Sequence, residues 1–209
     1  MFPVVTVPPA AGLVEQLGTK PKFWFDERRT LFKEGRADTG ENWAEVIGAQ
    51  LCELLGLPHA TYSFATWTSG GDEVRRGVVT ANFAPRGRLV LGNELLPRVT
   101  EYDGTLCYKQ TAYSMPRVRA ALRSLLPPSG FSESGLSTAI DVFVGYLMLD
   151  AWIANQDRHH ENWGSVVESR TSIVLTPAFD HAAGFGSILT DRERAARLTT
   201  RDAIPSPAR

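Results

Sequence analysis

The chain has 209 residues, of which 43% are hydrophobic and 22% charged, and its formal net charge is -1. This length allows one domain or a two-lobed unit with a sizeable core. The balanced charge excludes a general attraction to nucleic acid or to an anionic membrane, and two cysteines, Cys52 and Cys107, are too few for a disulfide framework. No window reaches the ~18 apolar residues of a membrane span, and the first residues lack a signal-peptide pattern. We therefore expect a cytoplasmic protein without direct nucleic-acid binding or membrane association.

The first half of the sequence reads as strands with one helix. Short runs of β-branched and aromatic residues, bounded by Pro and Gly, predict strands at 3–7, 22–25, 29–35, 60–68 and 75–83, the last two forming a hairpin. Between them, residues 39–56 show apolar side chains at the 3.6-residue period and predict a helix. Thr39 or Glu41 lies near its expected N-cap, and Gly56 and Pro58 end it.

The second half reads as mainly helical, followed by a short hairpin. Residues 115–127 and 138–155 predict helices, the second so apolar that we expect it to be buried. Residues 163–169 and 172–180 predict two short strands, and 190–198 a polar helix. A change in composition near residues 84–100 suggests the boundary between two lobes.

A polar loop follows the apolar helix, in the sequence "NQDRHHENW", and brings in residues suited to phosphoryl transfer. Asp157 is suited to receive or orient an acceptor hydroxyl, which is the main chemical task of the protein in phosphoryl transfer. Asn162 lies five positions later, the Asp-to-Asn separation of the protein-kinase catalytic loop, and Asp180 lies 23 positions after Asp157. A carboxylate and an amide oxygen are ligands that Mg²⁺ accepts, so Asn162 and Asp180 are the predicted metal ligands.

The first half supplies the complementary positive charge. Lys33 ends a predicted strand, and Glu45, near the inner face of the following helix, is its expected ion-pair partner. Glu41 is the alternative partner, although its position suits the helix cap and dipole better. The loop "LGTKPK" offers the backbone amides of Gly18 and Thr19 and the ammonium group of Lys22 as phosphate contacts.

Two motifs, "NQDRHHENW" and "LTPAFDHAAGFG", resemble the signature of the HipA-like serine/threonine kinases, whose fold is related to that of phosphoinositide kinases. "GTKPKFWF", "LFKEG" and "WAEVIGAQLCELLGLP" occur in the order of that family's phosphate loop, nucleotide lysine and first-lobe helix. The resemblance covers roughly residues 15–190. It implies that Asp157 is the catalytic base, that Asn162 and Asp180 bind magnesium, and that Lys33, paired with Glu45, binds ATP.

The resemblance also sets the expected architecture and partners. We expect an α+β, two-lobed protein-kinase-like fold: an N-lobe at 1–90 with an antiparallel sheet and one helix, and a mainly helical C-lobe at 91–209. The C-lobe would carry the catalytic loop at 155–162 and the metal-binding motif at 177–186, with adenine near "VVTANFAP". The implied cofactors are ATP and Mg²⁺. The implied partners are a protein substrate, phosphorylated on serine or threonine, and an antitoxin-like regulator in a toxin-antitoxin pair.

Several alternatives stay open from the sequence. Only 29 residues follow Asp180, where the family usually continues through more helices, so a shortened, nucleotide-binding pseudokinase-like module is one alternative. A kinase of a lipid or small-molecule hydroxyl is another. His159, His160, Glu161 and His181 raise the question of a zinc site, but their spacing lacks a helical pair of ligands. Thr19 is the nearest hydroxyl for regulatory autophosphorylation of the phosphate loop.

Overall fold

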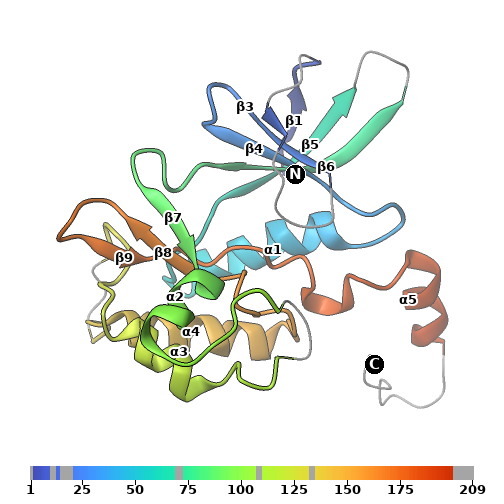
Figure 1. Ribbon diagram of the computed structural model, residues 1–209. Helices are drawn as coiled ribbons and strands as arrows, with labels where there is room; N and C mark the ends of the chain where they lie inside the picture. Colours follow the sequence, from blue (N-terminus) through green and yellow to red (C-terminus); the bar gives the residue numbers. More distant parts are fainter. Residues whose placement is uncertain are drawn as a thin grey trace.

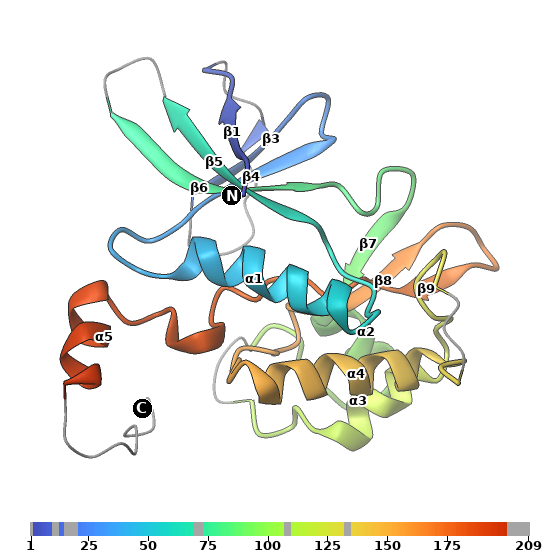
Figure 2. The same ribbon diagram turned by 180° about the vertical axis from the view of Figure 1, so that it is seen from behind.

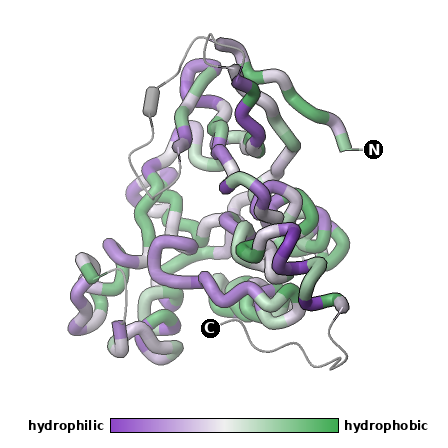
Figure 3. The backbone as a smooth tube through the Cα atoms, turned by 90° about the vertical axis from the view of Figure 1, so that its right-hand side faces the viewer, coloured by the Kyte–Doolittle hydropathy of each residue, from purple (hydrophilic) through white to green (hydrophobic). Residues whose placement is uncertain are grey.

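The computed structural model describes residues 2–9, 13–14, 21–68, 73–106, 110–131 and 135–199, with only the backbone at 13–14. Its two lobes are stacked, a six-stranded sheet above and a group of helices with a three-stranded sheet below (Figure 1). The predicted α+β, two-lobed kinase-like fold is confirmed. Hydrophilic and hydrophobic stretches occur in both lobes, so composition sets neither lobe apart (Figure 3).

The larger sheet has the strand order β1-β5-β6-β4-β3-β2. Its strands are β1 (Val4–Val7), β2 (Leu13–Val14), β3 (Lys22–Phe25), β4 (Thr30–Glu34), β5 (Tyr62–Thr68) and β6 (Val74–Ala81). All neighbours are antiparallel except β1, which pairs in parallel with β5. The expectation of a purely antiparallel sheet therefore fails at this edge. Only a long crossover connection can bring two strands together in parallel, and here β2–β4 and α1 supply it.

Two separate sets of side chains cover the two faces of this sheet. Phe23, Phe32 and Trp67 pack with neighbouring valines and alanines on one face. On the other face, Val46 and Ala49 of helix α1 (Glu41–Leu54) pack against Val78 and other sheet residues. The helix lies between the sheet and the helices of the other lobe, as the two opposite views show (Figures 1 and 2).

A glycine lies at each end of helix α1, Gly40 before it and Gly56 after it. Its N-cap is Gly40, which makes no side-chain capping bond, and neither Thr39 nor Glu41 takes that place. After Leu54 the chain reaches Gly56 at φ 67°, a left-handed conformation that glycine adopts without strain and that ends the helix.

The second lobe is built from helices α2 (Gly92–Val99), α3 (Met115–Leu122), α4 (Ala139–Trp152) and α5 (Asp191–Leu198), and a sheet of order β7-β8-β9. Its strands are β7 (Arg88–Leu91), β8 (Gly164–Val167) and β9 (Ile173–Leu175), and a one-turn 3₁₀ helix lies at Gly184–Gly186. The β8–β9 hairpin and three of the four helices were predicted, whereas β7 and α2 were not. The change from one sheet to the other falls between Ala81 and Arg88, and the domain boundary after residue 90 stays a prediction.

Helix α4 forms the centre of the second lobe but is not buried all round. Phe143, Tyr146 and Leu149 are at most 1% exposed, whereas Met148 and Trp152 are 69% and 64% exposed. The expectation of a buried helix therefore holds for one face and is wrong for the other, because apolar composition alone does not show how many neighbours a helix has. In the described part of the chain, no helix is both long and apolar enough to cross a membrane.

Candidate active site

Lys33 and Glu45 meet between the sheet and α1. The Lys33 Nζ atom donates to Glu45 Oε1 at 2.5 Å and to Asp180 Oδ1 at 2.9 Å. Glu45 is 2% exposed, and the ring of Tyr62 lies 5.8 Å from Lys33 Nζ. Burial alone would lower the pKa of Lys33, but the carboxylates of Asp180 and Glu45 raise it well above its usual value. The lysine is therefore a fixed positive charge at neutral pH.

Glu41 does not take the place of Glu45. Its carboxylate accepts from the Arg36 backbone N at 2.9 Å and from Arg36 Nη1 at 2.6 Å, so it closes the turn that precedes α1. Glu45 lies one helical turn further on, where the inner face of α1 meets β4.

Lys22 shares one face of the sheet with Lys33. The two residues are directly opposite each other in the β3–β4 pair, and directly opposed side chains of an antiparallel pair lie on the same face. The two lysines therefore leave the sheet as neighbours on one face, and Lys22 lies just after the predicted phosphate loop. Gly18 and Thr19, the other predicted phosphate contacts, lie outside the described residues, so their roles stay predictions.

Asp157 and Asn162 lie in the loop between α4 and β8. The Asn162 side-chain amide donates to the backbone oxygen of Asp157 at 2.6 Å, which leaves the amide oxygen as an acceptor. The Asp157 side chain is 57% exposed, with Oδ1 3.7 Å from the Nε2 atom of His159. His159 also accepts from the Glu161 backbone N at 3.2 Å, which supports the loop. The carboxylate of Asp157 is thus held by its loop and open to an incoming group.

Arg158 organises this loop from inside the lobe. Its guanidinium group binds Asp150 of α4 with two bonds, Nε to Oδ2 at 2.7 Å and Nη2 to Oδ1 at 2.8 Å. Its third nitrogen, Nη1, donates to the backbone oxygen atoms of Asn162 at 2.9 Å and of Phe179 at 3.3 Å. One nitrogen atom thus holds the backbone of Asn162, a predicted metal ligand, next to that of Phe179, the residue before the other predicted ligand, Asp180.

Asp180 follows β9 in a strained conformation. Its φ is 60°, which is uncommon for a residue other than glycine, and its backbone N donates to the Tyr62 hydroxyl at 3.2 Å. This backbone turn aims the carboxylate at Lys33. Strain of this kind persists only where surrounding contacts hold it, and here the contacts come from Tyr62, Lys33 and Arg158.

The segment after Asp180 runs along α1. His181 donates its backbone N to Glu45 Oε2 at 2.7 Å, and its ring is fully buried beneath Gly48. A Cβ atom at position 48 would lie 2.7 Å from the Cβ atom of His181, so only glycine allows this close approach. Further along, Phe185 packs against Trp43, and the Gly40 N donates to the Ser187 oxygen. Both carboxylate oxygens of Glu45 are therefore fixed, Oε1 by Lys33 of the sheet lobe and Oε2 by the His181 backbone of the helical lobe.

The donor set fits a magnesium ion by type. Asp180 supplies a carboxylate and Asn162 an amide oxygen, both hard ligands, and Arg158 binds the backbone oxygens of Asn162 and of Phe179, which precedes Asp180. Within the described residues, no group of three or more His, Cys, Asp and Glu side chains is arranged to hold a metal ion. His160, one of the possible zinc ligands, instead contacts the Tyr102 hydroxyl at 2.6 Å.

Three residues of the site escaped the sequence reasoning, Asp150, Arg158 and Tyr62, whereas His181 was considered only as a possible zinc ligand. Asp150 and Arg158 left a signal, because a carboxylate inside an apolar helix requires a buried partner nearby. Tyr62 left none, since a tyrosine at the start of a strand is ordinary, and its role depends on a residue 118 positions away.

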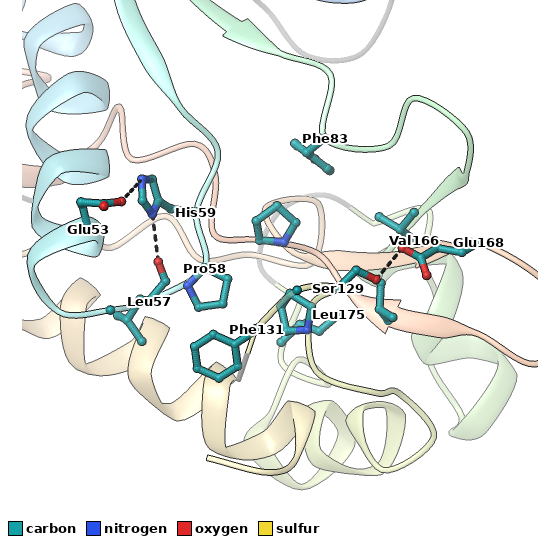
Figure 4. Close-up of a pocket in the computed structure, with 15 residues that line it drawn as sticks. Glu53, Leu57, Pro58, His59, Phe83, Ser129, Phe131, Val166, Glu168 and Leu175 are labelled. Carbon is teal, nitrogen blue, oxygen red and sulfur yellow. Dashed lines mark hydrogen bonds and ion pairs between the residues drawn. The ribbon is translucent and has the colours of Figure 1, made fainter. Parts of the chain in front are cut away.

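Figure 4 shows a pocket that is lined by other residues than Lys33, Asp157 and Asp180. We call it the Phe83 pocket. It has a volume of about 480 Å³. Its lining comes from the α1–β5 loop, from Phe83 after β6, from the β8–β9 hairpin and from residues 128–131. Its lining includes Phe83, from the segment expected near adenine, and Pro177, from the predicted metal-binding motif, but none of the predicted catalytic, phosphate-binding or metal-binding side chains.

The arrangement defines the class of fold to which the chain belongs. A sheet lobe with a buried lysine-glutamate pair, joined to a helical lobe with a hairpin followed by an aspartate, is a kinase-like fold. Neither a protein-family model nor a curated protein matches the sequence. Among solved structures, the chain is similar to the crystal structure of a Helicobacter pylori proinflammatory kinase, CtkA, with a TM-score of 0.68 and 17% identity. The match covers 97% of this chain and 67% of that chain, and at this identity it shows the fold alone.

Proposed function

We propose that the chain is an ATP- and magnesium-dependent kinase that transfers the γ-phosphoryl group to a serine or threonine hydroxyl of a protein. The observation that carries this proposal is the position of Lys33, bound to both Glu45 and Asp180 at the junction of the two lobes of a kinase-like fold. A lysine held by a helix glutamate is the arrangement that fixes nucleotide phosphates in kinases. Membership of the HipA-like family stays a prediction.

Each residue of the site has a task in this proposal. Lys33, with Lys22 on the same face of the sheet, binds phosphate oxygens, and Glu45 orients Lys33. Asp157, exposed in its loop, accepts a hydrogen bond from the substrate hydroxyl and takes its proton as transfer proceeds. Asn162 and Asp180 would hold Mg²⁺, which neutralises charge on the phosphates when bound. Arg158 keeps these two positions together without touching the reacting atoms.

The direct test is phosphate transfer from γ-labelled ATP by the full chain, in Mg²⁺, to a dephosphorylated cell lysate. Asp157→Asn is expected to lower transfer by roughly 10²–10⁴-fold, the usual contribution of a general base. Folding should not change, because the Asp157 side chain is 57% exposed. Asp26→Asn is the matched control, since it makes the same chemical change at an exposed turn of the sheet lobe.

Three outcomes would reject parts of this proposal. Transfer by Asp157→Asn at the wild-type rate would remove Asp157 from the mechanism. Label that resists protease and extracts with lipids or small molecules would make the acceptor something other than a protein. If ATP with Mg²⁺ raises the melting temperature while no acceptor is labelled, the chain is a nucleotide-binding module without transfer.

A further inference from the structure

The Phe83 pocket combines an apolar interior with negative charge at both ends. Its volume of about 480 Å³ is within the range of ligand pockets. Leu57 and Phe131 lie below Phe83 in Figure 4, while Glu53 lies at one end and Glu168 at the other. No lysine or arginine is among the lining residues. The pocket therefore suits an apolar group that carries positive charge, and it repels phosphates and nucleic acid.

At one end, Glu53 and His59 are arranged to receive a cation. The Nδ1 atom of His59 donates to the Leu57 carbonyl oxygen at 2.9 Å, so in the neutral ring Nε2 is an acceptor. That Nε2 atom lies 3.6 Å from Glu53 Oε2. A lone pair and a carboxylate thus face each other, and an ammonium or guanidinium group between them would donate to both.

At the other end, Glu168 is a fixed carboxylate. Its two oxygen atoms accept from the hydroxyl groups of Ser129 at 2.6 Å and Ser172 at 2.9 Å. These hydroxyl groups hold the pKa of Glu168 below its usual value, so it is ionised at neutral pH. In the part of the chain that the structure describes, Glu168 forms no ion pair with a lysine or arginine.

We propose that the Phe83 pocket is a docking site for an extended peptide segment of a protein partner. An apolar side chain of that segment enters the pocket, and basic side chains on either side bind Glu53 at one end and Glu168 at the other. A peptide suits the pocket better than a small organic cation, because the two carboxylates lie at opposite ends and one small cation meets only one of them. This inference goes beyond phosphate transfer, since binding here requires neither nucleotide nor Asp157.

The pocket is also connected to the catalytic motif. The Pro58 oxygen accepts from the Ala178 N at 2.9 Å, and the Ala60 N donates to the Ala178 oxygen at 2.8 Å. The Phe83 ring stacks on Phe179 with ring centroids 5.5 Å apart. The wall of the docking site therefore continues directly into Asp180, two residues beyond Ala178.

The test is binding of the full chain, without nucleotide, to an array of short synthetic peptides. Each peptide carries one leucine or phenylalanine and two lysines or arginines at varied spacing, and a matched set carries glutamate instead. We expect binding to members of the basic set alone, weakening as salt rises. The dissociation constant of the best peptide, measured by fluorescence anisotropy, should be about tenfold higher for Glu53→Gln/Glu168→Gln.

The control is Glu27→Gln/Glu73→Gln, which removes the same charge from two exposed side chains of the sheet lobe and should keep wild-type affinity. The proposal is overturned if no peptide binds, if the acidic set binds equally well, or if both double variants lose affinity alike. Because the assay contains no nucleotide, a chain that docks peptides but transfers no phosphate leaves this proposal standing. A chain that transfers phosphate but docks none rejects only this one.

Discussion

The imidazole ring of His181 is fully buried, and neither of its nitrogen atoms has a hydrogen-bond partner among the described residues. One of these nitrogens must carry a proton, so the site leaves a polar group unsatisfied next to the predicted metal ligand. Burial, reinforced by the nearby Arg158 charge, lowers the pKa of His181 to about 3. The ring is therefore neutral in the folded protein throughout the physiological range.

This burial makes stability depend on pH. Between the ordinary histidine pKa of 6.5 and about 3, the unfolded chain binds a proton at His181 and the folded chain does not, so acid favours unfolding. We expect His181 to contribute a loss of about 1.4 kcal/mol per pH unit as pH falls through this window. Urea unfolding of wild type and His181→Phe at several pH values measures the difference. Parallel curves for the two proteins would contradict the assigned burial.

Asp150 and Arg158 form a buried ion pair, and the side chain of each is 7% exposed. Arg158→Met is expected to cost about 3–5 kcal/mol of unfolding free energy, because it leaves the Asp150 charge without compensation. Arg158→Met/Asp150→Leu should recover much of that loss. Chemical denaturation measures both variants. If the double variant were as unstable as the single one, the bonds of Arg158 to the Asn162 and Phe179 oxygens would be the larger contribution.

The sequence indicated the residues that carry the chemical groups of the site better than the residues that hold them in place. Asp157, Asn162, Asp180, Lys33 and Glu45 carry oxygen or ammonium groups at separations typical of phosphate chemistry, so sequence spacing indicated them. Tyr62, which holds Asp180 in place, contacts it across 118 positions of the chain, and this contact exists only after folding. A tyrosine at the start of a strand is also ordinary, so nothing in the sequence marks it.

At the scale of elements, the strands and helices with a distinctive run of residues were predicted, and those without one were not. Helix α1 shows the 3.6-residue period, helix α4 is a long apolar run, and the β5–β6 hairpin consists of two runs rich in β-branched and aromatic residues. Strand β7 has four residues, and α2 contains Pro97, which weakens any helix pattern. These two elements form because β8 offers β7 a free edge and because α2 packs behind it, and both are tertiary reasons.

Helix α4 starts at a capping box that can be tested. The Thr138 side chain accepts from the Asp141 N, and the Asp141 carboxylate accepts from the Thr138 N at 2.9 Å. We expect Thr138→Ala to lower the unfolding free energy by about 1 kcal/mol, because the first turn of the helix loses a partner. Ser137→Ala is the neighbouring control, since only its backbone N contributes. An equal effect of both substitutions in thermal unfolding would contradict the capping role.

At the scale of the molecule, the two lobes share a core through α1. The first part of this helix packs against the large sheet, whereas Cys52 and the following Leu57 belong to the core of the helical lobe. Cys52 is 0% exposed, and Leu57 contacts Gly145 of α4. A boundary drawn from composition could not show this, because a single helix contributes to both cores.

This sharing predicts that residues 1–90 do not fold alone. Without the helical lobe, Cys52 and Leu57 lose their neighbours, and the C-terminal end of α1 becomes an exposed apolar surface. We expect poor amide dispersion in the NMR spectrum of this fragment, against a dispersed spectrum of the full chain. A cooperative thermal transition of the isolated fragment would show instead that the sheet lobe is an independent domain.

The ion pair between Lys33 and Asp180 has a consequence for the order of events in the site. The lysine ammonium is the counterion of the carboxylate on which a divalent cation would depend. A metal ion that binds alone must displace the lysine ammonium from Asp180, so it gains little free energy. A nucleotide that binds with the metal ion offers its phosphate oxygen atoms to the displaced ammonium. Metal and nucleotide should therefore enter as a pair, through an exchange of partners that leaves none of the charges exposed without compensation.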